Sequence, residues 1–183
     1  MRLLLLALSL PLLLAAETPL QSANAKMEKF SNDQWRPGEI VTFSPAEIDA
    51  WIRDQAHKAV PLGLRDPRIA LGTGTATGSA LVDFVKLEQA RGKTPGMISK
   101  MFEGERPIKV SVRLASANGT CTVFLTRVEI GGASLEGRPL DLLISTFLRP
   151  LYPDAKINQP FEMDSSIDRI ELRPDGVRIT IKK

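Results

Sequence analysis

The sequence predicts an α+β fold: a single twisted antiparallel sheet of about six strands, built from hairpins, with helices covering one face. Three observations lead to this prediction. Apolar and polar residues alternate along several segments, which is typical of strands with one buried face. Tight turn sequences join successive strands, and strands joined in this way must be antiparallel. Apolar stripes at helical spacing lie between the hairpins, so helices are expected there.

The chain begins with the pattern of a secretory signal peptide over residues 1–16. Arg2 gives a positive start, residues 3–14 form an apolar run, and small alanines follow before a polar stretch. The apolar run is about a dozen residues long, whereas roughly 20 are needed to span a bilayer. We therefore expect export to the periplasm or the extracellular space, with cleavage after Ala16 or alternatively after Ala25.

The rest of the chain divides into a loosely helical N-terminal segment, residues 17–34, and a single α+β domain, residues 35–183. The clearest helix start lies at Ser44, which begins an S-x-x-E capping box with Glu47 and precedes a proline. This pattern predicts a helix over residues 45–57. Further helices are expected from Thr94 to about residue 102, with Met101 and Phe102 in its apolar stripe, and over residues 140–151. Ile98 belongs to the apolar stripe of the helix that begins at Thr94.

Three turn sequences define the hairpins. Asn118-Gly119 fits a two-residue turn in which both central positions need positive φ, and Pro174-Asp-Gly fits the turn of a closing hairpin over residues 167–183. The glycine-rich segment 72–78 resembles a dinucleotide-binding loop, but the strand-like segment 75–85 follows it where that loop needs a helix. We therefore expect a hairpin there.

The predicted return strand, residues 120–130, contains an irregularity. Its apolar positions change parity between Leu125 and Val128, which predicts either a bulge or two partly covered faces.

Composition argues against several classes of function. The net charge is +3 and like charges do not cluster, which argues against binding to nucleic acid. Cys121 and His57 are the sole cysteine and histidine. The composition therefore excludes an intrachain disulfide and argues against most histidine- or cysteine-based metal sites and catalytic triads. We expect no metal, no cofactor and no catalytic residue, with an unrecognised hydrolase based on distant carboxylates as a third possibility.

Four basic residues alternate with apolar ones along two predicted strands and are expected to share the solvent face of the sheet. They are Lys109, Arg113, Arg178 and Lys182. The face is either an ordinary solvated surface or a site of weak contact with anionic lipid headgroups at a membrane surface.

A long connection, residues 152–166, follows the helix over 140–151 and carries several large apolar residues. Such a connection is unusual for a purely solvated loop. Its apolar groups are expected either to form a lid on the core or to line a cavity beside the sheet. In the second case the cavity would be lined by Phe147, Leu151, Tyr152 and Phe161, and would hold a lipid or another apolar small molecule.

Three segments, FSPAEIDAWI (43–52), GSALVDF (78–84) and LYPDAK (151–156), resemble an uncharacterised family of exported bacterial α+β proteins, over roughly residues 35–183. More distantly, the order of elements is similar to envelope proteins of the lipomannan-elongation type and to AsmA-like modules, which are associated with lipid binding or transfer. The resemblance implies a non-enzymatic envelope protein that binds an apolar ligand between sheet and helices. A structural or protein-interaction module of the envelope without a small ligand is the alternative. No oligomeric state and no functional residue follow from it.

Overall fold

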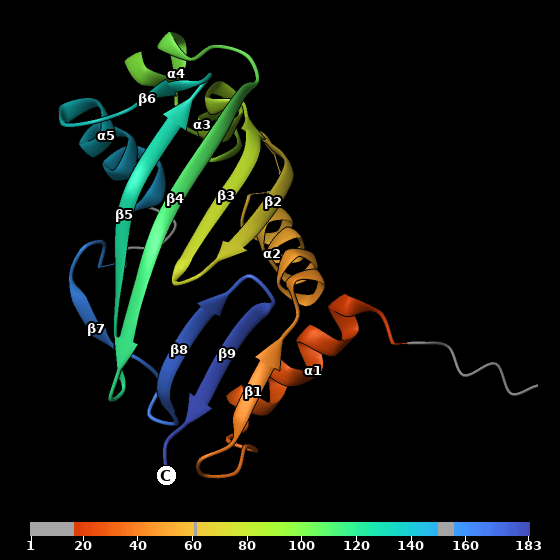
Figure 1. Ribbon diagram of the computed structural model, residues 1–183. Helices are drawn as coiled ribbons and strands as arrows, with labels where there is room; N and C mark the ends of the chain where they lie inside the picture. The colour runs from red at the N-terminus through yellow and green to blue at the C-terminus, as the bar shows by residue number, and fades with distance from the viewer. Residues whose placement is uncertain (1–16, 61, 150–155) are drawn as a thin grey trace, which may run out of the picture.

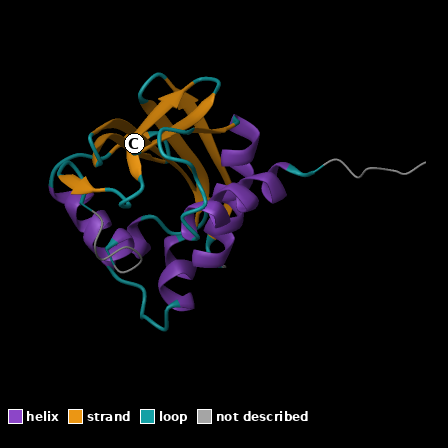
Figure 2. Ribbon diagram, turned by 90° about the horizontal axis from the view of Figure 1, so that it is seen from below, coloured by secondary structure: helices purple, strands orange, loops and turns teal. Residues whose placement is uncertain are grey.

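A computed structural model describes residues 17–60, 62–149 and 156–183 and shows the predicted α+β class. Strands lie on one side of the molecule and helices on the other (Figures 1 and 2). The predicted signal peptide, residues 1–16, lies outside the described residues. The helical elements are α1 (Pro19–Ser31), α2 (Pro45–Ala59), α3 (Phe84–Ala90), α4 (Met97–Met101), α5 (Arg138–Leu143) and the π-helical turn η1 (Ile144–Leu148).

The larger sheet contains six strands, all paired antiparallel. Five strands follow one another across the sheet, and the sixth, β7, pairs with the start of β5. The strands are β2 (Leu64–Gly72), β3 (Thr75–Val82), β4 (Arg106–Ala117), β5 (Thr120–Ile130), β6 (Ala133–Ser134) and β7 (Pro160–Glu162). The predicted number of about six strands is therefore confirmed for this sheet.

The prediction of a single sheet is wrong in one respect, because the closing hairpin belongs to a second sheet. β1 (Ile40–Phe43), β9 (Gly176–Ile181) and β8 (Ile167–Arg173) form a three-stranded sheet in the order β1-β9-β8. The Ser116 hydroxyl on β4 donates to the Ile170 carbonyl on β8 (2.6 Å) and accepts from the Ile170 N–H (2.8 Å). The Ser116 side chain therefore supplies hydrogen bonds to the backbone of β8 at a position where a neighbouring strand would otherwise supply them.

The irregularity in β5 is a bulge, as its apolar pattern indicates. Ser111 pairs with Arg127 and Val112 pairs with Leu125, so Thr126 has no opposite residue. The Thr126 hydroxyl donates to the Ser111 carbonyl at 2.9 Å. The bulge lets β5 keep apolar residues on its helix-facing side at both ends, and such bulges bend and twist a strand.

The apolar faces of the two sheets are covered by different sets of helices, although α2 also packs beside β2 of the larger sheet. Under the larger sheet, a core cluster includes Val82, Phe84, Val128 and Phe147. Under the smaller sheet, α1 and α2 pack on a second cluster that includes Val41, Phe43, Ile179 and Ala23, whose exposed fraction is 0%.

The helix predicted from the capping box is confirmed as α2. The Ser44 hydroxyl accepts from the Glu47 N–H, and the Glu47 carboxylate accepts from the Ser44 N–H. The N-terminal segment forms α1, which begins with its own capping box between Thr18 and Gln21. His57 is exposed in the last turn of α2, where a basic residue suits the helix dipole.

The strand expected over 75–85 ends early, because β3 stops at Val82 and α3 begins at Phe84. The Asp83 side chain accepts from the Lys86 N–H at 3.0 Å and so caps α3. Phe84 is buried as expected, but it packs from a helix. A capping interaction overrides the strand preference of this apolar segment.

The helix expected from Thr94 to about residue 102 is only the short α4. Phe102 packs near Phe84 with ring centroids 5.8 Å apart, but Met101 is 67% exposed and does not join the core. The side chain of Ile98 is not among those described. The connection expected over 152–166 likewise contains structure, since β7 pairs with β5 from within it.

We predict that Gly176→Ala destabilises the fold much more than Gly104→Ala does. Both glycines have positive φ, but a Cβ at residue 176 would lie 2.1 Å from the Phe43 carbonyl oxygen, whereas nothing lies within 4 Å at residue 104. The first change combines backbone strain with a clash between β1 and β9 and should cost about 3 kcal/mol or more. The second should cost about 1 kcal/mol. Urea unfolding of both variants measures the difference, and equal losses would show that β1 does not pack as described.

Candidate functional site

The metal-ligating residue types do not gather into a metal site in the described part of the chain. No group of three or more His, Cys, Asp or Glu side chains there could hold a metal ion. Cys121 is buried, and burial raises the pKa of its thiol, which keeps it protonated. No helix among the described residues is both long enough and apolar enough to cross a membrane.

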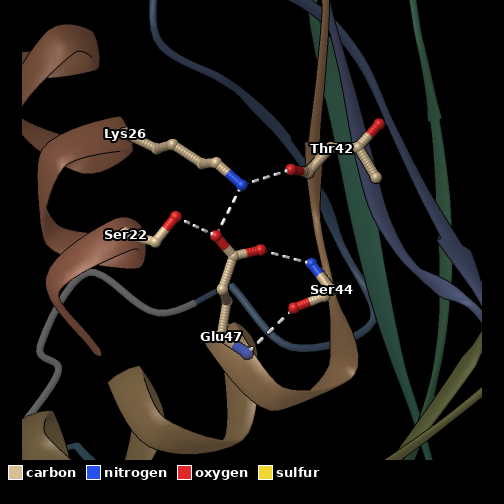
Figure 3. A network of polar contacts seen from close by, with 5 residues as sticks. All are labelled: Ser22, Lys26, Thr42, Ser44 and Glu47. Carbon is tan, nitrogen blue, oxygen red and sulfur yellow. Dashed lines mark hydrogen bonds and ion pairs between the residues drawn. The ribbon is translucent and has the colours of Figure 1, made fainter. Parts of the chain in front are cut away.

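The most connected polar cluster surrounds Glu47 (Figure 3). One carboxylate oxygen accepts from the Ser22 hydroxyl and the Lys26 ammonium, each at 2.5 Å, and the other accepts from the Ser44 N–H at 2.6 Å. Lys26 also donates to the Thr42 carbonyl at 2.8 Å. These contacts join α1 to the start of α2 and to β1.

The electrostatics of Glu47 indicate a structural role. Burial raises the pKa of its carboxyl, but hydrogen bonds from Lys26, Ser22 and Ser44 outweigh this effect and lower the pKa to about 2. A carboxylate with so low a pKa is a poor general base near neutral pH. Its oxygens already accept hydrogen bonds from protein donors. Since these donors include Ser22 and Lys26 on α1, the cluster holds α1 against α2 and β1.

The strongest candidate site is an apolar cavity of about 370 Å³ between the larger sheet and the helices α3, α5 and η1. All of its described lining residues are aliphatic or aromatic. The lining residues are Leu64, Val82, Phe84, Leu87, Ile108, Val110, Val112, Val123, Leu125, Val128, Leu140, Leu143, Ile144, Phe147, Leu148 and Ile157. The volume lies within the range of about 300–1,000 Å³ that is typical of small-molecule sites.

Alternation along the strands explains how the sheet supplies its share of this wall. Val110 and Val112 follow each other at a spacing of two on β4, and Val123 and Leu125 do so on β5. After the bulge at Thr126 the helix-facing parity resumes at Val128. The sheet therefore presents a continuous apolar surface to the cavity.

The helical wall contains a π-helical turn. The Arg149 N–H donates to the Ile144 carbonyl at 3.0 Å, five residues earlier. Leu143 and Phe147 are buried on this segment, and Phe147 packs edge-on against Phe84 with ring centroids 5.0 Å apart. The apolar stripe predicted for this helix therefore faces the sheet.

A second depression of about 840 Å³, with a mixed polar and apolar lining, adjoins this cavity along the outside of α5 and η1. We call it the basic hollow, because Arg138, Arg149 and Lys156 are among its lining residues. Ile144, Leu148 and Ile157 line both the basic hollow and the apolar cavity, so the two share a boundary.

Of the four residues predicted to line a pocket, Phe147 lies in the wall of the apolar cavity. Phe161 does not, because β7 pairs with the start of β5 and places Phe161 beside Cys121, beyond the last cavity residue of that strand. Leu151 and Tyr152 lie outside the described residues. The wall residues on β4 and β5 were not predicted as site residues, although their alternation marked them as buried.

The four basic residues do not share the face of one sheet as predicted, because β4 and β9 belong to different sheets. Lys109 and Arg113 on β4 and Arg178 on β9 alternate with the residues that face the cores, so they point away from the helices. Arg113 stacks on the Phe124 ring, with its guanidinium carbon 3.9 Å from the ring centroid. Arg178 forms an ion pair with Asp175 at 3.4 Å, and Lys109 lies opposite Glu129. Lys182 is exposed next to the end of β9. Carboxylates therefore interrupt this basic surface.

No protein-family model, no curated protein and no solved structure matches this chain.

We predict that the Glu47 cluster makes stability depend on pH between about 4.5 and 2. The pKa of Glu47 is lower in the folded state, so its contribution is complete above the unfolded value and is lost as the pH falls through the folded value. A shift of this size corresponds to about 3 kcal/mol. Glu47→Gln should therefore unfold more easily than the parent protein at pH 7 and about equally at pH 2.

Glu28→Gln, an exposed change on α1, is the matched control and should leave the pH dependence intact. Urea unfolding at a series of pH values measures both variants. A Glu47→Gln variant with the parental stability at pH 7 would contradict the structural role of the cluster.

Proposed function

We propose that this chain is an exported, non-enzymatic protein of the cell envelope that binds a lipid or another apolar ligand in the apolar cavity. The observation that carries the proposal is the cavity itself, whose described wall consists of apolar side chains from the sheet and from three helical elements. Close packing is the rule in protein interiors, where voids larger than a water molecule are few. A cavity of about 370 Å³ is far beyond that limit.

The energetics favour a binding site over a packing irregularity. The cavity is partly open to solvent, so in the unliganded protein water contacts the apolar side chains of its described wall, which is unfavourable. Filling it with an aliphatic chain would recover dispersion contacts and bury apolar ligand surface at about 25 cal/mol per Å². The described wall offers water few hydrogen-bonding partners, which favours an apolar ligand over water in this space.

We predict that Val112→Phe abolishes binding of an apolar probe without unfolding the protein. The larger ring would project from β4 into the cavity, where it replaces the ligand and can keep or raise stability. Ala115→Phe is the matched control, because residue 115 is exposed on the same strand and has the opposite parity. The neutral fluorophore phenylnaphthylamine, whose emission rises in apolar surroundings, provides the titration.

The parent protein and Ala115→Phe should bind the probe alike, and Val112→Phe should bind at least about tenfold more weakly, which corresponds to 1.4 kcal/mol. If the parent protein does not bind the probe, the proposal fails and a structural module without a small ligand remains. Native mass spectrometry of protein purified from its own envelope would reveal a co-purified ligand directly.

We predict that the exported protein begins near Glu17. Cleavage after Ala25 would remove Ser22, which donates to Glu47, and Ala23, which is fully buried beneath the smaller sheet. Cleavage after Ala16 keeps α1 and its capping box intact. N-terminal sequencing of the exported fraction tests this. A mature start at Lys26 would contradict the choice of site, and an intact Met1 on protein in the cytosol would contradict export.

A further inference from the structure

We infer that the ligand is an anionic amphiphile with a single aliphatic chain, whose chain enters the apolar cavity and whose headgroup lies in the basic hollow. This inference rests on the proposed function, since it needs the cavity to bind an apolar chain. It adds the chemical class of the ligand and the residues that recognise its polar end.

The charge of the basic hollow is the first observation. Arg138, Arg149 and Lys156 line it, and Asp141 is the one carboxylate among its described lining residues. Among the described lining residues, three cations against one anion give an excess of positive charge. Arginine and lysine are the side chains that bind carboxylate and phosphate groups by charge-assisted hydrogen bonds.

The boundary between the two spaces is the second observation. Ile144 and Leu148 on η1 and Ile157 on the opposite side line both of them. The three residues form the wall that the two spaces share, so a ligand that occupies both must pass its aliphatic chain between them, where it would contact apolar side chains while its charged end stays outside. An amphiphile is the ligand class that matches an apolar space and a cationic space placed side by side.

The backbone around the basic hollow fixes the positions of the cations. Arg138 begins α5 and Arg149 directly follows η1, so both are held by one helical segment. Lys156 is close in sequence to Asn158, whose side chain accepts from the Leu125 N–H and whose N–H donates to the Val123 carbonyl, each at 2.9 Å. The backbone two residues after Lys156 is therefore anchored to β5, beside the cavity wall, and Lys156 itself is exposed.

The size of the cavity limits the ligand to one chain. At about 370 Å³ it lies near the lower end of the range of about 300–1,000 Å³ for small-molecule sites. A single chain of medium length suits this volume better than the two chains of a bilayer phospholipid. Affinity should rise about fourfold for each added methylene until the chain fills the cavity, and then level off.

The test measures displacement of phenylnaphthylamine by ligands that share one chain and differ in headgroup charge. Decanoate and decyl phosphate carry an anion, decanol is neutral, and decyltrimethylammonium is cationic. We expect both anions to bind about tenfold more tightly than decanol at low salt, with the cation weakest and the differences shrinking at high salt. The tighter of the two anions identifies the headgroup as carboxylate or phosphate.

The double variant Arg149→Gln/Lys156→Gln should lose about tenfold in affinity for the preferred anion while its affinity for decanol stays unchanged. Unchanged decanol binding also shows that the variant is folded. Lys58→Gln is the control for charge, because Lys58 is exposed on α2 and does not line the basic hollow.

The outcomes separate this inference from the proposed function. If the probe binds but decanol competes as well as both anions, or if the double variant binds the anions like the parent protein, the inference is overturned and apolar binding stands. If the probe does not bind at all, both fail together.

Discussion

The architecture depends on the edge at which the long strand β4 continues past its pairing with β3 and meets β8 of the smaller sheet. β3 covers β4 only from Arg106 to Arg113, and buried backbone groups that lack partners are costly. The turn between β2 and β3 continues the coverage, because the Leu114 N–H donates to the Gly74 carbonyl. Beyond this turn, the Ser116 hydroxyl forms hydrogen bonds with both the carbonyl and the N–H of Ile170 on β8. One hydroxyl thus joins the two sheets where a strand ladder stops.

Because of this junction, the long hairpin of β4 and β5 contacts β8 of the smaller sheet at one end and faces the helices along the rest of its length. The bulge at Thr126 bends β5 and restores the helix-facing parity of its side chains, so the apolar surface continues along the strand. The helices on this side cover that surface without filling the space beneath it. The apolar cavity is therefore a consequence of a long curved hairpin and a short helical segment, α5 and η1, laid across it.

Two buried carboxylates hold the helical elements in place. Glu47 ties α1 to α2 and β1, and Glu88 accepts from the Gly96 N–H and from the Ser99 hydroxyl, which ties α3 to α4. Because α3 contributes Phe84 and Leu87 to the cavity wall, the second contact supports the candidate site directly. Both carboxylates accept hydrogen bonds from protein donors, which suits a structural role. The proposed amphiphile would lie between this fixed wall and the basic hollow.

Local signals in the sequence determined the elements whose cause is local. The capping box at Ser44, the turn at Asn118-Gly119 and the parity change in β5 each act within a few residues, so α2, the β4–β5 hairpin and its bulge could be predicted. The α+β class and Phe147 as a buried residue next to the sheet followed from periodicity in the same way.

Tertiary structure alone decided what depends on residues far apart in the chain. The pairing of β1 with β9, which makes a second sheet, joins segments from opposite ends of the domain. The cavity wall draws on side chains from Leu64 to Ile157, and the basic hollow brings Arg138 together with Lys156. No pattern within a short segment records such contacts, because they follow from which surfaces meet when the elements pack. The sequence determined which residues are apolar and where the chain turns, and packing decided that some of those apolar residues enclose a space.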